Sequence, residues 1–427
     1  MILALILFII TYLLMMIFST KREIIVIISS ILFTLLGIIN FKEAITAINY
    51  DALLIIIGTM GIVGFFIESK MPCLMADYLL TKVTDTKWAI VVLAMLAGIV
   101  SAFVDNVATV LMVAPIGLAI CKKLNISPVN ALIAISVSSN LQGAATLIGD
   151  TTSIILGSYA NMNFVEFFFV EGKPSIFFAV ELGAIVTIPV MLFLFRKYKT
   201  KIPKGEITKI SDYFPTILII LNIVLLIINS FLPTNSIITN GVICIALYII
   251  GIIYYIIRKR NFKIIKNSLK AIDLKTIIML AGIFVVIAGI TKAGLIQQLS
   301  NIFIKIGKNN IFIIYTVITF GSVFLSSFID NIPYVATMLP VVSQIATTAN
   351  APIYLLYFGL LSGATLGGNL TPIGASANIT TIAILKKEGY NVKLKDYFKI
   401  GIPFTLAAVI TGYLYIWFVW GNNIYTN

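Results

Sequence analysis

The chain contains no histidine, so any proton coupling in it must use carboxylates. Its three cysteines (Cys73, Cys121 and Cys244) are scattered and form no CxxC or other metal-ligand spacing, which excludes a cysteine-based metal site. Charged residues make up only 11% of the 427 positions, whereas 60% are hydrophobic. A soluble domain of this length would need far more polar surface to cover its core. The composition therefore predicts a membrane protein.

Apolar runs of helical length recur along the whole chain and are too long for β-barrel strands. Since lipid cannot satisfy backbone polar groups, these runs must be helices, and we predict an all-α polytopic membrane protein. Residues 1–18 lack a basic leader region and are predicted as a retained first span. The predicted full spans are ten: 1–18, 24–40, 52–68, 129–160, 174–195, 213–231, 236–257, 276–294, 353–385 and 400–420.

Two further apolar stretches, 88–120 and 310–345, are interrupted near their centres by Asp-Asn. Each is long enough for two arms, which predicts a re-entrant hairpin. With both treated as hairpins and the N-terminus outside, 25 of the 30 basic residues face the cytoplasm. This asymmetry predicts a multi-pass protein of the inner or plasma membrane with both termini outside. The same asymmetry accounts for the net charge of +13. Nucleic-acid binding is disfavoured as its cause, because no basic helix or aromatic stacking platform accompanies the basic residues.

An internal repeat relates the two halves of the chain at a constant offset of 225 residues. An odd number of spans separates the copies, so the second copy is expected to be inverted in the membrane. We predict a first repeat over 1–200, with hairpin 88–120 and broken helix 129–160, and a second over 201–427, with hairpin 310–345 and broken helix 353–385. The motifs that keep the offset are Ser101–Asn106 with Ser326–Asn331, Pro115 with Pro340, Gly64 with Gly289, and Thr146–Gly149 with Thr371–Gly374.

Polar residues cluster at four places inside these apolar segments, where they are costly unless they face a cavity, pair or bind an ion. Two clusters lie at the hairpin turns and two where Gly, Pro and small polar residues break the long spans. Carboxylates, amide oxygens and hydroxyls are hard ligands that suit Na⁺, and half-helix ends can compensate an anion. The predicted binding residues are Asp105, Asn106, Thr146, Gly149, Asp150, Thr151, Asp330, Asn331, Thr371, Gly374, Ser376 and Asn378, with Na⁺ predicted at Asp105, Asn106, Asp330 and Asn331.

Asp150 differs from the other carboxylates because the repeat places Ala375 at its matching position. We therefore prefer Asp150, a carboxylate without a counterpart in the other repeat, as the residue that couples transport to H⁺ or Na⁺. For Asn140, Thr109 and Thr337, a role in holding helices together is as plausible as direct binding. The four breaks carry no Lys, Arg or His in the sequence, which favours a cationic or neutral cargo.

The sequence resembles the arsenite permease and NhaD-type sodium–proton antiporter group of the ion-transporter superfamily, in which citrate and dicarboxylate carriers are more distant members. The resemblance covers nearly the whole chain and is sharpest at FVDNVATVLMVAP, ATLIGDTTSI, SSFIDNIPYVATMLP and LGGNLTPIGASANI. It implies a scaffold domain that dimerises, a transport domain with elevator-like movement, and roles for the two Asp-Asn pairs and the broken-helix residues. One departure concerns Gly149-Asp150-Thr151-Thr152-Ser153, where the group reads Gly-Asp-Pro-Pro-Asn.

These observations predict a secondary active transporter, either a Na⁺/H⁺ antiporter or a proton-linked efflux carrier for a solute such as arsenite. The alternative is a Na⁺-coupled symporter of citrate- or dicarboxylate-type anions, with bound Na⁺ and helix N-termini offsetting the anion. A channel is disfavoured because nothing resembles a selectivity filter. An intramembrane aspartyl protease is disfavoured because the repeat explains the Asp pair, so we expect no enzyme. The expected partners are a small ion, membrane lipid and a second copy of the chain, with no cofactor beyond Na⁺ or H⁺.

Overall fold

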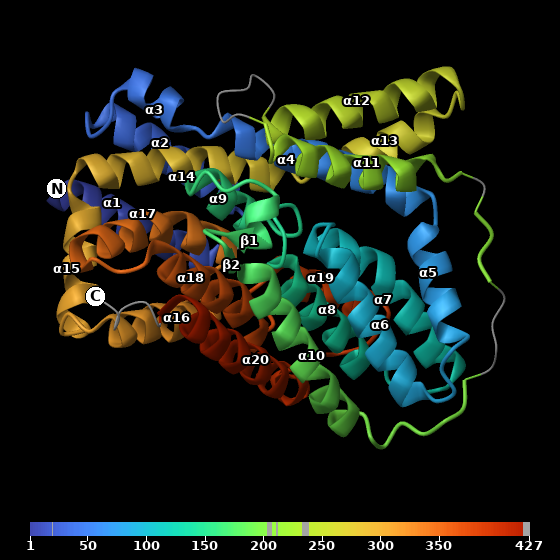
Figure 1. Ribbon diagram of the computed structural model, residues 1–427. Coiled ribbons are helices and arrows are strands. Elements are labelled where there is room, and N and C mark those ends of the chain that lie inside the picture. The colour runs from blue at the N-terminus through green and yellow to red at the C-terminus, as the bar shows by residue number, and fades with distance from the viewer. Residues whose placement is uncertain (19, 203–206, 211, 233–238, 422–427) are drawn as a thin grey trace.

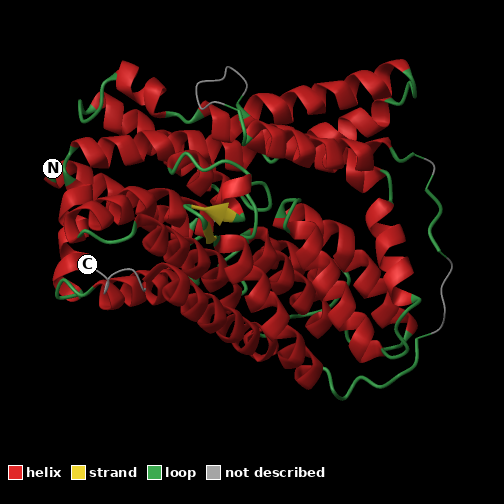
Figure 2. Cartoon of the chain, in the orientation of Figure 1, coloured by secondary structure: helices red, strands yellow, loops and turns green. Residues whose placement is uncertain are grey.

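A computed structural model describes residues 1–18, 20–202, 207–210, 212–232 and 239–421. Helices form nearly all of its regular structure (Figure 2). The exception within the described residues is a two-stranded antiparallel hairpin, β1 (Phe169–Val170) and β2 (Lys173–Pro174). The prediction of an all-α protein is confirmed at this level.

The helices of the first half run in chain order with short connections. Their bounds are α1 Ile2–Ile17, α2 Arg22–Leu35, α3 Phe41–Ala47, α4 Tyr50–Glu68, α5 Met71–Leu80, α6 Thr86–Ser101, α7 Asn106–Lys123, α8 Val129–Gly143, α9 Thr151–Tyr159 and α10 Ile176–Leu194, with a 3₁₀ turn η1 at Val165–Phe167.

The second half has helices in a matching order. Their bounds are α11 Phe214–Asn229, α12 Asn240–Ile257, α13 Phe262–Ala271, α14 Leu274–Lys292, α15 Leu295–Ile306, α16 Ile311–Ser326, α17 Asn331–Ala349, α18 Ile353–Gly367, η2 Gly368–Leu370, α19 Ser376–Lys387, α20 Leu394–Ile416 and η3 Trp417–Gly421. α16, α17 and α19 each begin 225 residues after α6, α7 and α9, which is the offset of the sequence repeat.

Eight helices among the described residues are long and apolar enough to cross a membrane, or nine if the bent pair α15–α16 forms one span. The eight include α7 and α17, which the sequence predicts as arms of re-entrant hairpins, and they overlap six of the ten predicted spans; 1–18, 24–40, 129–160 and 213–231 are not among them. Two of them, 1–18 and 213–231, correspond to α1 and α11, which are 16 residues each. At 1.5 Å per residue such helices reach about 24 Å, which is short of a full hydrocarbon core of about 30 Å.

The interruptions predicted from glycine, proline and Asp-Asn coincide with helix ends. Stretch 88–120 is a helix–turn–helix of α6 and α7, and 310–345 is one of α16 and α17. The long spans 129–160 and 353–385 are each broken, into α8 and α9 and into α18 and α19. Asp, Asn and Thr side chains begin many of these helices by accepting backbone N–H groups, as Asp85 does for α6.

Helices distant in sequence pack side by side. α2 packs on α14, α4 on α12 and α13, α6 on α8, α16 on α18, and α10 on α20. Figure 1 shows α2, α14, α4, α11 and α12 along one side of the molecule, with the hairpins and broken helices beneath them. This arrangement places the turns after α6 and α16 near the breaks of α8 and α18.

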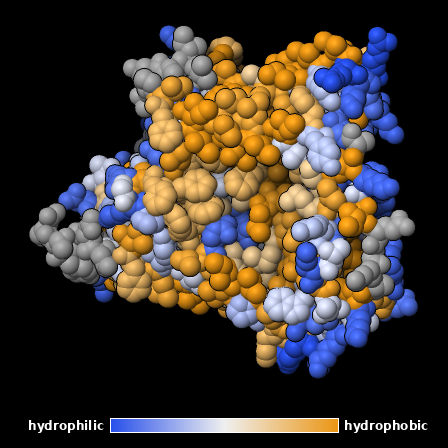
Figure 3. All heavy atoms as spheres, turned by 45° about the vertical axis from the view of Figure 1, so that its right-hand side comes forward, coloured by the Kyte–Doolittle hydropathy of each residue, from blue (hydrophilic) through white to orange (hydrophobic). Residues whose placement is uncertain are grey.

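The outer surface is largely apolar, as a lipid-facing surface requires. Figure 3 shows hydrophobic side chains covering most of one face, with hydrophilic side chains gathered towards one edge. Exposed residues that contribute to the apolar surface include Ile217, Ile249 and Ile253. Together with the helix lengths, this supports a multi-pass membrane protein.

Candidate functional site

Both hairpin turns end in an aspartate that caps the following helix. Asp105 Oδ1 accepts the backbone N–H groups of Val107 at 3.0 Å and Ala108 at 3.2 Å at the start of α7. Asp330 Oδ1 accepts the N–H of Ile332 at 3.1 Å at the start of α17. The two Asp-Asn pairs thus share one local structure, as the repeat predicts.

The breaks of the two long helices are tied to these hairpins through backbone contacts. The hydroxyl of Thr146 donates to the carbonyl of Ala102, and that of Thr371 donates to the carbonyl of Ser327. A Cβ on Gly149 would lie 2.5 Å from the Gly143 carbonyl oxygen. Only glycine permits this approach, so Gly149 and its counterpart Gly374 serve the packing of the breaks.

A chain of buried amides joins the first break to the second. Asn106 Nδ2 donates to Asn140 Oδ1 at 2.8 Å, and Asn140 Nδ2 donates to Asn369 Oδ1 at 2.8 Å. Asn140 Nδ2 also reaches Asn378 Oδ1 at 3.2 Å, and that oxygen accepts from the Ser136 hydroxyl at 2.6 Å. For Asn140, this geometry favours the role of holding helices together over direct binding.

Asp150 lies at the N-terminus of α9 and is 2% exposed. The hydroxyl of Thr152 donates to its Oδ2 at 2.8 Å, and Asn106 Nδ2 lies 3.5 Å from its Oδ1. In turn, Thr152 contacts Thr365 of α18 at 3.1 Å between hydroxyl oxygens. Neutral donors alone therefore face this carboxylate within the described residues, so a proton or a cation can compensate its charge.

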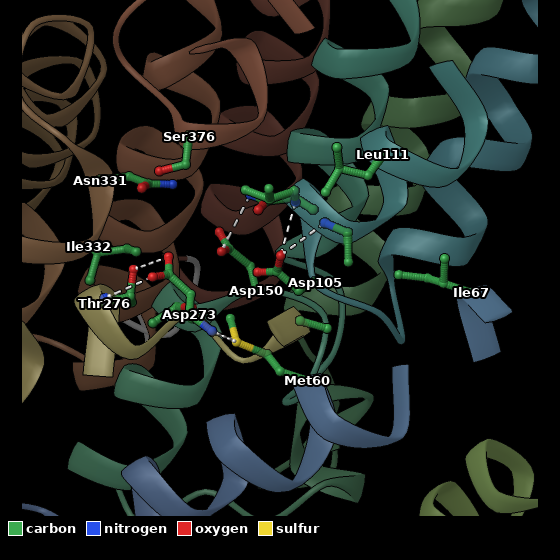
Figure 4. A pocket seen from close by; sticks show the side chains of 15 residues that line it. Met60, Ile67, Asp105, Leu111, Asp150, Asp273, Thr276, Asn331, Ile332 and Ser376 are labelled. Atoms are coloured by element: carbon green, nitrogen blue, oxygen red, sulfur yellow. Dashed lines mark hydrogen bonds between the residues drawn. The ribbon is translucent and has the colours of Figure 1, made fainter. Parts of the chain in front are cut away.

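These segments enclose a cavity of about 90 Å³. Figure 4 shows Asp105 and Asp150 close together in its wall, Asp273 beside them, and Asn331 and Ser376 across the cavity. None of its described lining residues is basic. Six predicted site residues line it: Asp105, Asn106, Asp150, Thr151, Asn331 and Ser376.

The remaining predicted residues lie around the cavity rather than in its wall. Asn378 Nδ2 donates to the carbonyls of Gly368 at 3.0 Å and Thr371 at 3.3 Å, inside the second break. Thr146, Thr371 and Gly374 hold the breaks against the hairpins, as described above. Gly149 lines a smaller space of about 10 Å³ next to Asp105 and Asp150.

Asp330 does not line this cavity and instead forms an ion pair. Its Oδ2 accepts from Nη1 of Arg22, which begins α2, and the two side chains are 3% and 14% exposed. The expectation that no basic side chain accompanies the four breaks is therefore wrong at the second hairpin. Arg22 lies 308 positions away in the chain, so the local sequence around Asp330 could not reveal it.

Sequence reasoning also missed Asp273, the third carboxylate in the cavity lining. It caps α14, with Oδ1 accepting from the N–H of Lys275 at 3.1 Å and Thr276 at 3.2 Å. Because Asp273 is itself solvent-exposed, the cavity opens beside it. The signal was a helix-capping aspartate at the end of a basic segment, which a search for polar residues inside apolar runs passes over.

Comparison with known proteins assigns this architecture to a family. Residues 5–361 and 265–426 match a family model described as "Citrate transporter". The chain belongs to the citrate transporter family. It is accordingly a multi-pass membrane transporter and not an enzyme. This family lies in the superfamily that the sequence resembles; the closer assignment to its arsenite permease and NhaD-type group remains a hypothesis.

Relatives of this citrate transporter family member cover most of its length. The "46 kDa membrane protein" of Mycobacterium leprae is 28% identical over 97% of this chain and 98% of its own length. An "Uncharacterized transporter" of Mycobacterium tuberculosis is 28% identical over 87% of this chain and 86% of its own. The "P protein" of Homo sapiens is 25% identical over 88% of this chain, which spans 54% of that longer protein.

Two solved structures share the fold. The YdaH transporter of Alcanivorax borkumensis aligns with a TM-score of 0.61 at 10% identity, over 89% of this chain and 88% of that one. MtrF of Neisseria gonorrhoeae, from a class of antimetabolite efflux pumps, aligns with a TM-score of 0.55 at 15% identity, over 88% and 82%. At these identities the likeness concerns the fold alone.

Proposed function

We propose that the chain is a cation/proton antiporter, with Na⁺ or a similar small cation exchanged for H⁺. One observation carries the proposal: Asp105, Asp150 and Asp273 line one cavity whose described lining includes no basic side chain. Asp150 is buried and Asp105 is partly buried, and carboxylates withdrawn from water without a fixed counter-ion need a mobile one. Because a cation and a proton compete for the same carboxylate oxygens, binding of one releases the other, which is the basis of exchange.

The size and chemistry of the cavity support a small inorganic ion. A volume of about 90 Å³ has room for a small ion with some of its water. Carboxylate, amide and hydroxyl oxygens are the hard ligands that such cations prefer. Asp150 is the coupling residue in this proposal, since Thr152 and Asn106 stabilise its charged form without neutralising it. Proton-linked efflux of a neutral solute such as arsenite would use the same hydroxyls and carboxylates.

A second candidate is Na⁺-coupled symport of a citrate- or dicarboxylate-type anion, which the family's description suggests. A specific observation favours it: α7, α9, α17 and α19 begin at residues that line the cavity, so four helix N-termini converge there. Such termini attract anions. The Asn331 amide nitrogen, buried and without a hydrogen-bond partner among the described residues, adds a free donor.

The transport cycle in this proposal uses two inverted repeats, 1–200 and 201–427, that bring their hairpin turns together at mid-membrane. The matched element order and the constant offset support the repeat. An elevator-type movement, a homodimer and termini outside are the corresponding expectations from the family resemblance and the charge pattern. With this orientation, the basic segment 258–275, which contains α13 and Asp273, faces the cytoplasm, and the cavity beside Asp273 opens to that side.

The test is transport by purified protein in proteoliposomes loaded with a pH-sensitive dye. Na⁺, Li⁺, arsenite, citrate or succinate is added outside in separate runs. We expect a proton flux on addition of Na⁺ or Li⁺ alone, and its loss in Asp150→Asn. Glu171→Gln removes a carboxylate from an exposed turn and is the matched control, for which we expect the flux of the unmodified protein.

If no cation drives a proton flux and labelled citrate or succinate instead enters in a Na⁺-dependent manner, the antiport proposal is wrong and the symport candidate stands. If arsenite alone drives the flux, proton-linked efflux replaces cation exchange. Retention of full cation-driven flux by Asp150→Asn would remove Asp150 from the coupling step.

A further inference from the structure

The two hairpin turns are alike except for one contact. In each, Oδ1 of the aspartate caps the following helix, through Val107 and Ala108 in the first turn and Ile332 in the second. In the second turn Oδ2 of Asp330 accepts from the guanidinium of Arg22. In the first turn, no side chain of the described residues bonds Oδ2 of Asp105, and the residue faces the cavity instead.

Within the part of the chain that the structure describes, no basic side chain at the first turn plays the part of Arg22. Arg22 follows the connection between α1 and α2, and the matching connection between α11 and α12 spans 230–239. That stretch contains no Lys or Arg. The repeat therefore carries the same carboxylate twice and a fixed counter-ion once.

Arg22 is held on the second hairpin by contacts of its own helix pair. The hydroxyls of Thr11 in α1 and Ser29 in α2 are 2.6 Å apart, which ties the two helices together. The Tyr12 hydroxyl donates to the carbonyl of Pro333 in α17 at 2.8 Å and contacts Thr337. The helix pair α1–α2, which positions the Arg22 guanidinium at Asp330, is thus itself hydrogen-bonded to α17 of the same hairpin.

The side-chain amide of Asn331, next to Asp330, is not held by another side chain of the described residues, whereas that of Asn106 is. In the first repeat Asn106 is fixed by Asn140, whereas the position that matches Asn140 is Thr365. The Asn331 amide nitrogen consequently has no partner among the described residues, although the residue is 2% exposed and lines the cavity. Both carboxylate oxygens of Asp330 are bonded, whereas no described side chain fixes the Asn331 amide, so its oxygen can turn towards a cation.

We infer that Asp330 and Asn331 form a second small-cation site, the counterpart of Asp105 and Asn106, and that the guanidinium of Arg22 occupies it as a tethered cation. The inference rests on the proposed cation site at Asp105 and Asp150 and extends it. A carboxylate that is 3% exposed requires a compensating charge. With Arg22 in place the carrier binds a single cation, and removal of Arg22 opens the second site.

The experiment measures equilibrium binding of ²²Na⁺ to purified full-length protein at alkaline pH, where protons compete least with Na⁺ for the carboxylates. The variants are Arg22→Met, which keeps the length and apolar stem of the side chain, and Arg22→Lys, which keeps the charge. We expect a single Na⁺ per chain for the unmodified protein and for Arg22→Lys, and a second Na⁺ for Arg22→Met. The double variant Arg22→Met/Asp330→Asn should lose the second ion only.

A second readout guards against a variant that fails to fold. Carbodiimide labelling of Asp330, located by peptide mass, should be slow in the unmodified protein, faster in Arg22→Met, and slowed again by Na⁺ in that variant. No gain of Na⁺ and no Na⁺ protection in a monodisperse Arg22→Met would overturn the inference. If the unmodified protein binds no Na⁺ but Arg22→Met shows Na⁺ protection at Asp330, the proposed function fails while the tethered-cation site stands.

Discussion

The side-chain amide of Asn140 in α8 donates to Oδ1 of Asn369 in the turn after α18, with 2.8 Å between nitrogen and oxygen. Both residues are fully buried, and Asn369 Nδ2 in turn donates to the carbonyl of Val137 at 3.0 Å. The breaks of two helices more than 200 positions apart are therefore locked to each other by reciprocal hydrogen bonds. Since Asn140 also accepts from Asn106, this pair connects the first hairpin turn to the second broken helix.

Replacing Asn140 by alanine should destabilise the protein by about 1–3 kcal/mol, because the Asn106 amide and the Asn369 oxygen lose buried partners. The measurement is thermal unfolding of detergent-solubilised protein. Asn267→Ala is the matched control, because it removes a solvent-exposed hydrogen bond from the Asn267 amide to Glu68. Equal losses in both variants would mean that the buried network contributes nothing beyond a surface hydrogen bond.

Gly149→Ala should also destabilise the protein, by about 1–3 kcal/mol for overpacking against a rigid neighbour. The added Cβ would lie 2.5 Å from the Gly143 oxygen and 2.7 Å from the oxygens of Ala102 and Ser101, all of them backbone atoms. A Cβ on Gly321 in α16 would have no heavy atom within 4 Å, so Gly321→Ala should be neutral or stabilising by up to about 1 kcal/mol. The comparison is made on thermal midpoints, and similar midpoints for the two variants would contradict it.

Much of this site was accessible from the sequence because its parts have local signatures. Glycine and proline marked the breaks after Gly143 and Gly367, and Asp-Asn marked the two turns, because these residues interrupt or cap helices wherever they occur. Arg22 and Asp273 were not accessible in the same way. The position of each depends on how helices distant in the chain pack, and neither lies inside an apolar run that would make its charge conspicuous.

A surface ion pair offers a test of pH dependence outside the membrane-spanning segments. Lys122 at the end of α7 pairs with Glu388 after α19, and this hydrogen-bonded pair lowers the pKa of Glu388. The stabilisation is thus present above the usual Glu pKa of about 4.3 and is lost as the pH falls through the lower folded-state value. Glu388→Gln should lower the thermal midpoint slightly at pH 7, since exposed pairs contribute little.

The difference between Glu388→Gln and the unmodified protein should vanish once the pH falls below the lowered folded-state pKa of Glu388, where both side chains are neutral. Glu171→Gln, at an exposed position, is the control and should show no such pH-dependent difference. A midpoint difference for Glu388→Gln that persists unchanged in acid would show that the contact acts through packing rather than charge.

Asp273→Asn tests whether the charge at the cavity mouth attracts the transported cation. Asparagine can still accept the N–H groups of Lys275 and Thr276, so the cap of α14 is kept while the charge is removed. Because Asp273 is exposed, its contribution is electrostatic and screened by salt, with a Debye length of about 10 Å at 0.1 M. We expect the cation concentration for half-maximal flux to rise about three- to tenfold at low ionic strength, equivalent to about 0.7–1.4 kcal/mol.

That increase should shrink towards unity at high concentrations of an impermeant salt, whereas the defect of Asp150→Asn should persist, since Asp150 is buried. Glu388→Gln makes the same change of charge away from the cavity and should leave the half-maximal concentration unchanged. A defect in Asp273→Asn that is independent of salt would assign Asp273 to direct coordination of the ion. An unchanged half-maximal concentration at low salt would exclude Asp273 from the entry path, and the cavity mouth would then carry no electrostatic selection for cations.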